Sequence, residues 1–268
     1  MKKLLVLSLS LFLLTSCAYI EKCPLFKKAS FKKISLKKFS FKKEKAHWGY
    51  TGKLAPENWG KLDKKFKACS EGKNQAPIDL SNFIKADLKP LTFAYNATAT
   101  EIFNNGHTVQ ANVAKGSSFS LDGKDFELLQ FHFHTPSENT IKGKFFPMEA
   151  HLVHSDKDGN LAVIAVMYEQ ESENAVIKSL WEKMPKKVGD KHSLADAAIN
   201  AFDLLPKDKS YYRFSGSLTT PPCTEGVRWI VMKKPVTISK EQVDEFAHVM
   251  HHPNNRPVQP LNSRIILK

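Results

Sequence analysis

The stretch that decides the fold is Gln130-Phe131-His132-Phe133-His134, in which imidazole and phenyl side chains alternate. Successive side chains of a β-strand point to opposite faces, so both histidines share a face with Gln130, away from the phenylalanines. Glu149-Ala150-His151-Leu152-Val153 alternates in the same way and groups His151 with Glu149. The two stretches predict neighbouring strands, each with one polar and one apolar face.

The three histidines of these strands can converge on one metal ion. Three imidazoles that hold Zn²⁺ leave the fourth tetrahedral position for water, which is how a catalytic zinc site is built. Gln130 and Glu149 would accept hydrogen bonds from the other ring nitrogens and fix the tautomers. An isolated His-x-His is more often a packed or exposed pair. Five polar residues in one pattern favour a zinc site at His132, His134 and His151, called here the histidine triad.

The rest of the chain predicts more strands than helices. Short apolar or alternating runs predict strands at residues 101–104, 107–113, 117–121, 126–134, 147–154, 161–168, 211–217 and 227–232. Asp122-Gly123 and Asp158-Gly159 are typical of hairpin turns. Helices are predicted at 172–184, 193–205 and 239–250. We therefore expect a mixed α/β, mainly β domain with a central, mostly antiparallel twisted sheet and short peripheral helices.

The positive charge of the chain is unevenly distributed. The 268 residues are 42% hydrophobic, enough for a sizeable core, and carry a formal net charge of +13. Ten of these charges are the balance of the lysines and glutamates that precede residue 47. The nearly neutral body gives no reason to expect nucleic acid as a partner.

Residues 1–16 are predicted to be a lipoprotein signal peptide. A basic Met1-Lys2-Lys3 precedes an apolar run from Leu4 to Leu14, which is too short for a transmembrane helix. Leu14-Thr15-Ser16-Cys17 resembles a bacterial lipobox, in which cleavage exposes a lipidated cysteine. The alternative is an ordinary signal peptide with Cys17 discarded. Either way we expect export to the bacterial cell envelope, with a lipid anchor facing the periplasm or the cell surface in the lipobox case.

Residues 17–46 are predicted to form a lysine- and phenylalanine-rich tether before the domain at 47–268. Its five-residue repeat gives neither a helix nor a strand a clean apolar face, which favours a linker. A second membrane contact through the lysines and a solvated spacer both remain open. Of the cysteines outside the lipobox, Cys69 and Cys223 most simply pair in an exported domain. Cys23 then becomes a free thiol or an intermolecular disulfide.

Four ordered motifs of the body carry a family resemblance. They are His47-Trp48-Gly49-Tyr50, the two strands with the intervening Ser137-Glu138-Asn139, the segment from Ser217 to Trp229, and Asn254-Asn255-Arg256-Pro257-Val258-Gln259-Pro260. Together they resemble the alpha-class carbonic anhydrases over about residues 47–268. The resemblance implies zinc-dependent, reversible hydration of CO2 to bicarbonate and a proton, with CO2 and bicarbonate as the small-molecule partners. The motifs do not decide whether the protein forms a homodimer.

The resemblance also implies roles for individual residues. The histidine triad would bind Zn²⁺, and Thr219 would accept a hydrogen bond from zinc-bound hydroxide and pass its own proton to Glu138. His107 would shuttle protons to solvent, and Tyr50 would help to order the water between. Cys69 and Cys223 match a disulfide of bacterial members. The pocket for CO2 would be lined by Val153, Val163, Leu218, Thr219, Thr220, Val227 and Trp229.

Two other classes of protein fit the sequence less well. A silent binding module would have lost metal ligands, whereas the histidine triad is complete. An unrelated metalloprotein, such as an iron-binding jelly-roll oxygenase, leaves the segment from Ser217 to Trp229 unexplained. Outside the triad, His154 points to the opposite strand face and is expected to be packed and hydrogen-bonded. His248, His251 and His252 gather at a helix C-terminus, which the helix dipole explains better than a second metal site.

Overall fold

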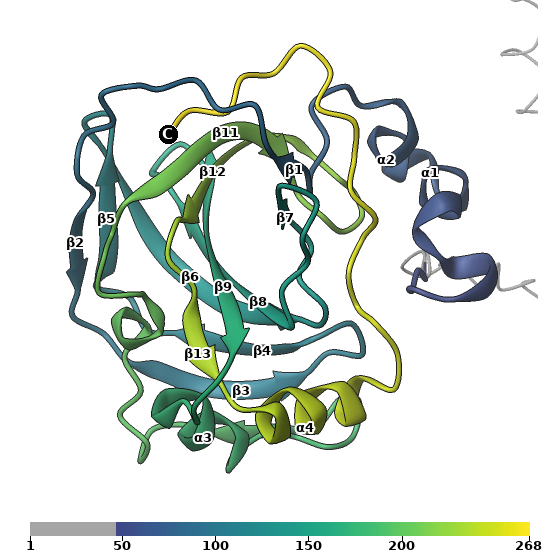
Figure 1. Cartoon of the computed structure of the whole chain (residues 1–268). Helices are drawn as coiled ribbons and strands as arrows, with labels where there is room; N and C mark the ends of the chain where they lie inside the picture. The colour runs from purple at the N-terminus through teal and green to yellow at the C-terminus, as the bar shows by residue number, and fades with distance from the viewer. Residues whose placement is uncertain (1–46) are drawn as a thin grey trace, which may run out of the picture. The chain divides into compact units, whose positions relative to one another are not determined.

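The computed structural model describes residues 47–268, which form one compact unit (Figure 1). The predicted signal peptide, Cys17, Cys23 and the tether lie outside the described residues. Within residues 47–268, no helix combines the length and the apolar character needed to cross a membrane.

An 11-stranded sheet forms the centre of the body (Figure 1). Its strands are β2 (Thr92–Tyr95), β3 (Ala99–Asn104), β4 (Val109–Val113), β5 (Ser117–Leu121), β6 (Lys124–His134), β8 (Met148–Ser155), β9 (Leu161–Gln170), β10 (Lys191–Ser193), β11 (Tyr211–Ser217), β12 (Glu225–Met232) and β13 (Val236–Ile238). The main path runs β10-β3-β4-β6-β8-β9-β12-β11, with β13 on β9 and with β2 joined through β5 to β6. A separate two-stranded sheet pairs β1 (Asp79–Leu80) with β7 (Thr140–Ile141).

The prediction of a mainly β, mostly antiparallel domain is confirmed. Within the large sheet, β12 and β13 run parallel to β9, and the other pairs are antiparallel. All eight predicted strands are present. The Asp122-Gly123 turn joins β5 to β6 with φ of 53° and 74°. Two left-handed residues match the twist of the flanking strands, which is why this pair of residues suits the hairpin.

Two of the three predicted helices are present in shortened or matching form. They are α3 (Ala175–Trp181) and α4 (Lys240–Met250), the second with the capping box of Ser239 and Gln242. The helix predicted at 193–205 is wrong. Backbone atoms of Leu194 and Ile199 instead bond to β3, and only residues 201–204 coil, as a 3₁₀ turn. The short α1 (Trp59–Leu62) and α2 (Ala68–Glu71) were not predicted.

The sheet buries both of its faces, and the alternation along the strands separates two cores. On one face Phe131, Phe133 and Leu152 are fully buried beneath α3 and α4, with the Phe133 ring 5.0 Å from that of Trp181. On the other face lies a second apolar cluster, built around Trp229 and flanked by the histidine triad. The strands therefore hold the polar site on the face that the helices do not cover.

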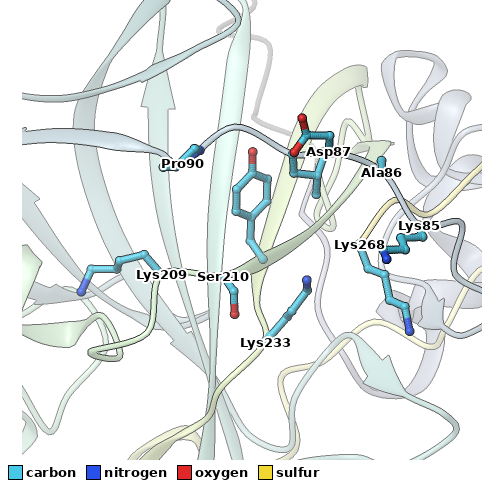
Figure 2. Close-up of a pocket in the computed structure, with 10 residues that line it drawn as sticks. Lys85, Ala86, Asp87, Pro90, Lys209, Ser210, Lys233 and Lys268 are labelled. Atoms are coloured by element: carbon cyan, nitrogen blue, oxygen red, sulfur yellow. The ribbon is translucent and has the colours of Figure 1, made fainter.

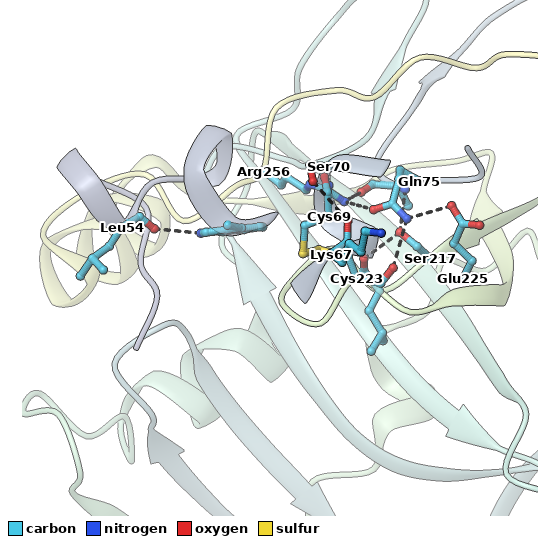
Figure 3. Close-up of a disulfide and its surroundings, with 12 residues drawn as sticks. Leu54, Lys67, Cys69, Ser70, Gln75, Ser217, Cys223, Glu225 and Arg256 are labelled. Carbon is cyan, nitrogen blue, oxygen red and sulfur yellow. Dashed lines mark hydrogen bonds between the residues drawn. A yellow bond between two sulfur atoms is a disulfide. The ribbon is translucent and has the colours of Figure 1, made fainter. Parts of the chain in front are cut away.

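The N-terminal part of the described chain is fastened to the sheet by a disulfide between Cys69 and Cys223 (Figure 3). This confirms the predicted pairing. The guanidinium of Arg256, 1% exposed, donates from Nη2 to the Cys69 carbonyl at 2.8 Å. Its Nη1 donates to Gln75 Oε1 at 2.9 Å and to the Ala76 carbonyl at 2.8 Å. One buried cation thus joins the C-terminal segment to the segment that precedes the sheet.

Candidate metal centre

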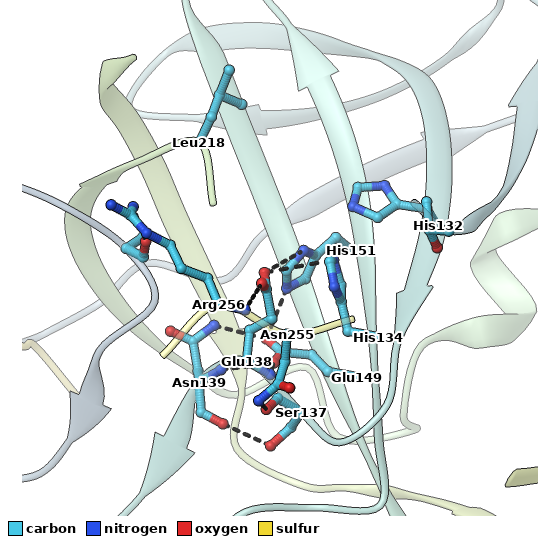
Figure 4. A network of polar contacts seen from close by, with 12 residues as sticks. His132, His134, Ser137, Glu138, Asn139, Glu149, His151, Leu218, Asn255 and Arg256 are labelled. Carbon is cyan, nitrogen blue, oxygen red and sulfur yellow. Dashed lines mark hydrogen bonds and ion pairs between the residues drawn. The ribbon is translucent and has the colours of Figure 1, made fainter. Parts of the chain in front are cut away.

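The histidine triad comes together where β6 and β8 pair. His132 lies opposite His151 in the antiparallel register, and His134 follows two residues along the same face of β6. One ring nitrogen from each residue lies within 4.8 Å of the others (Figure 4). In the part of the chain that the structure describes, this is the one such group of metal-ligating side chains.

Each imidazole of the triad uses one nitrogen in a hydrogen bond to an oxygen that cannot donate. The pairs are His132 Nδ1 with Gln130 Oε1 at 2.9 Å, His134 Nδ1 with the Asn254 carbonyl at 2.7 Å, and His151 Nε2 with Glu149 Oε1 at 2.9 Å. The bonded nitrogen must carry the hydrogen, so the other nitrogen keeps a lone pair. Burial lowers the pKa of all three rings below the ordinary value, which keeps them neutral.

This donor set fits Zn²⁺. Zinc takes neutral imidazole nitrogens, and a ligand must be deprotonated at the nitrogen that binds. His134 Nε2 is buried and has no hydrogen-bond partner among the described residues. Glu138 Oε2, 3.5 Å from it, is buried and unpartnered in the same part of the structure. Such atoms are costly unless something satisfies them, and a cation held by the triad would do so for His134 Nε2.

Glu149 is held in place by a complete set of donors. Its Oε2 accepts from the backbone of Glu138 at 2.7 Å and of Asn139 at 2.8 Å, and its Oε1 accepts from Asn139 Nδ2 at 2.7 Å. Asn139 in turn accepts from the backbone of Ile78 at 3.1 Å. The carboxylate therefore cannot rotate away from His151. The supporting role of Asn139 was not predicted.

Glu138 lies beneath the triad and is 0% exposed. Its Oε1 accepts from the Arg256 backbone at 2.8 Å. Burial raises the pKa of Glu138 to about 8, and hydrogen bonding from Arg256 and Thr219 opposes that rise. The Thr219 hydroxyl lies beside the carboxylate, although Oε2 has no partner that meets strict hydrogen-bond geometry within residues 47–268.

The predicted residues of the CO2 pocket lie together against the triad. Val163, Val227 and Trp229 are each at most 2% exposed and belong to the second apolar cluster. Val153 and Leu218 pack against the same cluster. The Trp229 ring lies 4.9 Å from that of His151, nearly perpendicular to it. Thr220, half-buried, accepts through its carbonyl from the Cys223 backbone at 2.8 Å and closes the loop next to this wall.

His107 and Tyr50 occupy an aromatic cluster with Trp48 and Trp59. The His107 ring stacks on Trp48 with centroids 3.7 Å apart, and Trp48 meets Tyr50 edge-on at 5.6 Å. The Tyr50 hydroxyl is buried without a hydrogen-bond partner among the described residues. Burial, together with the charges of two nearby histidines, lowers the pKa of His107 to about 4.

Two polar features lie outside this centre. A surface cavity of about 520 Å³ is lined in part by Lys85, Lys209, Lys233 and Lys268 and includes none of the predicted site residues (Figure 2). His154 is fully buried, with its Nε2 2.5 Å from the hydroxyl of Tyr95. The prediction that His154 is packed and hydrogen-bonded is confirmed.

Two residues that shape the site were quoted in the sequence motifs without a role. Asn254 accepts from His134 through its backbone and from the Thr135 backbone through its side chain, at 2.8 Å. Arg256 supplies the backbone donor of Glu138. Both lie about 120 residues from the groups that they bind. No local pattern in the sequence indicates such a pairing.

Comparison with known proteins assigns a family to the body. A family model described as eukaryotic-type carbonic anhydrase matches residues 54–268. A carbonic anhydrase of Pectobacterium carotovorum is 49% identical over 225 residues, 84% of this chain and 91% of the relative. One from Neisseria gonorrhoeae is 46% identical over 223 residues, 83% of this chain and 88% of the relative. The solved alpha-carbonic anhydrase of Thermovibrio ammonificans, in complex with sulfanilamide, superposes with a TM-score of 0.82 at 49% identity, covering 84% of this chain and all of that one.

Proposed function

The chain belongs to the alpha-class carbonic anhydrases and is itself a carbonic anhydrase with Zn²⁺ as cofactor, and we propose how its own residues divide the reaction. The observation that carries the proposal is the convergence of three neutral ring nitrogens beside a buried apolar wall. Bound at the triad, Zn²⁺ supplies a Lewis acid that makes water a nucleophile near neutral pH.

The apolar wall of Val163, Val227 and Trp229 receives CO2. The gas carries no charge and needs little beyond a dry concave surface, which these buried side chains supply next to His151. Val153 and Leu218 pack against the same cluster and extend the wall, and Thr220 lies in the adjoining loop. The wall also keeps bulk water from competing for the position where carbon is attacked.

Thr219 and Glu138 orient the reacting water. A Zn²⁺ ion at the triad would place a positive charge close to Glu138 and favour its ionised form despite burial. The ionised carboxylate accepts only, so it would accept a hydrogen bond from the Thr219 hydroxyl and leave the hydroxyl oxygen free to accept one in turn. The Arg256 backbone fixes one carboxylate oxygen of Glu138 at 2.8 Å. The other oxygen, Oε2, lies on the side of His134 and His151, at 3.5 and 3.8 Å from their ring nitrogens. The reacting water thereby has one preferred orientation relative to the wall.

His107 moves the product proton to solvent, with Tyr50 lining the route. Asn254 Nδ2 donates to the carbonyls of both His107 and Phe133, at 3.1 and 3.0 Å. Asn105 Oδ1 accepts from the His107 amide at 2.9 Å. These bonds hold the backbone of His107 beside β6, the strand that carries two histidines of the triad. An imidazole ring is the side chain best suited to carry protons near neutral pH.

Zinc content and CO2 hydration, measured together, test the division of roles. The His132→Ala variant removes one of three nitrogen donors, so we expect it to lose both stoichiometric zinc and hydration activity. Thr219→Ala should keep zinc and lose at least about tenfold in the hydration rate, because the hydroxyl orients water without holding the metal. Thr219→Ser, which restores the hydroxyl, is the matched control. A His132→Ala protein with full activity would contradict the ligand assignment.

We also propose that the enzyme is exported and held at a membrane by a lipid on Cys17. The Cys69–Cys223 disulfide supports a site of action outside the cytoplasm, as disulfides persist in oxidising compartments. Fractionation of bacteria that express the full chain tests the anchor: Cys17→Ser should move the enzyme from the membrane fraction to the soluble exported fraction. An unchanged membrane fraction would leave the tether lysines as the membrane contact. The homodimer stays a prediction, which sedimentation of the purified enzyme checks.

A further inference from the structure

Each hydration turnover releases one proton that must leave a buried centre. The ordinary pKa of imidazole, about 6.5, lies near neutral pH and suits the transfer. His107 is not the only histidine beside the aromatic cluster of Trp48 and Tyr50, which is called the rim of the centre here. His47 and His252 both lie near enough for a positive charge on them to lower the pKa of His107.

The stacked and partly buried position of the His107 ring limits how often it can accept a proton. The ring stacks on Trp48 with an interplanar angle of 8°. The backbone on either side is fixed, because Asn105 Oδ1 accepts from the His107 amide at 2.9 Å and Asn254 Nδ2 donates to the His107 carbonyl at 3.1 Å. With its pKa lowered to about 4, the stacked ring is neutral at pH 7 and rarely protonated.

His252 reaches the same aromatic cluster from the end of α4. The helix ends at Met250, and His251 adopts a left-handed φ of 62°, which turns the chain. After this turn the His252 ring lies 5.9 Å from that of Tyr50. Trp48, which carries His107, is itself 5.6 Å from Tyr50. The two imidazoles therefore flank one pair of aromatic rings.

The segment that carries His252 also supports the metal centre. Two residues beyond it, the Asn254 carbonyl accepts from His134 Nδ1 at 2.7 Å. His252 Nδ1 lies 3.0 Å from the Pro253 carbonyl, so Nδ1 carries the hydrogen and Nε2 keeps a lone pair. The side chain is half-buried, in contact with both the rim and solvent. A ring in this state can accept a proton at Nε2.

We propose that His252 is a second proton-transfer residue of this enzyme, working in parallel with His107. Its Nε2 takes the product proton to give an imidazolium, which returns a proton to a buffer base, so the ring ends each turnover neutral. The titratable groups at the rim are His107, His47 and Tyr50. Burial raises the pKa of Tyr50, which keeps it a neutral phenol. The inference rests on the proposed function of the centre.

The test separates CO2 conversion from proton transfer in the zinc-loaded, full-length protein. Exchange of ¹⁸O between CO2 and water, followed by mass spectrometry, gives one rate for CO2–bicarbonate interconversion and another for release of labelled water, which needs the proton. The variants are His107→Ala, His252→Ala and the double variant. His251→Asn is the matched control, because Asn tolerates a left-handed φ and removes the neighbouring imidazole.

We expect His252→Ala to lower water release at least about threefold, and the double variant to lie at least about tenfold below His107→Ala. A positioned proton-transfer group typically contributes about 10²–10⁴-fold, and two parallel routes share that factor. Interconversion should stay within about twofold of the parent, and imidazole buffer should restore water release. In NMR spectra the ring nitrogens of His252 should show the tautomer with the hydrogen on Nδ1, which leaves Nε2 free to accept the proton.

Three results would overturn the inference. They are a double variant equal to His107→Ala, a His251→Asn control with the same loss as His252→Ala, and a neutral His252 ring that carries its hydrogen on Nε2 instead of Nδ1. Absence of CO2–bicarbonate interconversion in the unsubstituted zinc-loaded protein is a different outcome, and it would refute the proposed function itself.

Discussion

Removal of the Cys69–Cys223 disulfide should destabilise the body mainly through the unfolded chain. The bond closes a loop with a sequence separation of 154. On the chain-entropy model, a loop of that length restricts the unfolded chain by about 17 cal/mol/K, or about 5 kcal/mol at 25 °C. The folded protein keeps other links at the same place: Arg256 Nη2 still donates to the Cys69 carbonyl, and Gln75 Nε2 to the Cys223 carbonyl, at 2.8 and 3.1 Å.

The stability loss converts into a measurable melting shift. At about 2.1 cal/mol/K per residue, a body of this size unfolds with an entropy near 0.46 kcal/mol/K. A loss of about 5 kcal/mol therefore lowers Tm by about 11 °C. Calorimetry of the Cys69→Ser/Cys223→Ser double variant and of the oxidised and reduced parent measures it. Because the bonds within the loop from Leu218 to Thr224 survive, zinc content should be unchanged at 25 °C.

The reduced parent is the control for the substitutions. It should have the same Tm as the double variant, and reductant should leave the Tm of the double variant unchanged. A double variant within about 2 °C of the oxidised parent would mean that the bond contributes less than about 1 kcal/mol. The chain-entropy argument would then be wrong for this fold.

Three further substitutions test the packing and the electrostatics. Glu149→Gln should weaken zinc binding about 10- to 100-fold, because the amide no longer holds His151 with a charge; dialysis against a chelator measures the affinity, and unchanged retention would contradict the support role. Burial lowers the pKa of His154 to about 3 from 6.5, so only the unfolded chain takes up its proton between these values. The free energy of unfolding should thus be highest above about pH 6.5 and fall as pH decreases, by up to about 1.4 kcal/mol per pH unit. When this free energy is measured by urea unfolding at several pH values, His154→Phe should make its pH dependence shallower. An equal slope in the parent and the variant would refute this. A Cβ at Gly216 would lie 2.8 Å from Trp229 Cδ1, so Gly216→Ala should lower the free energy of unfolding by about 1–3 kcal/mol, as measured with denaturant. An unchanged free energy of unfolding would show that the Trp229 ring can move aside without cost.

The alternation of side chains explains why the central strands could be predicted from the sequence. Along β6 and β8 each residue belongs to one face, so the same period that indicates a strand also sorts the metal ligands from the core. The register of His132 opposite His151 was not readable in this way. It depends on the β-bulge between Leu128 and Gln130, which local periodicity does not indicate.

Elements whose stability comes from distant partners were missed. The residues at 193–205 have a helical apolar spacing, yet the edge of β3 takes their backbone groups, and tertiary contacts override the weak local preference. Strands β1 and β7 are two residues each and pair with each other across 60 residues of chain. The contacts of Asn254 and Arg256 with the metal centre are missed for the same reason.

The hydrogen bond from His134 to Asn254 has a consequence for the order in which the enzyme is made. A ribosome that has added residue 230 has produced every zinc ligand, Glu138, Thr219 and the apolar wall. The acceptor that fixes His134, and the backbone donor that fixes Glu138, are still to be translated. Translation of the zinc ligands therefore does not by itself complete the site. The two groups that fix His134 and Glu138 join it only when the segment with residues 254 and 256 packs against the finished sheet.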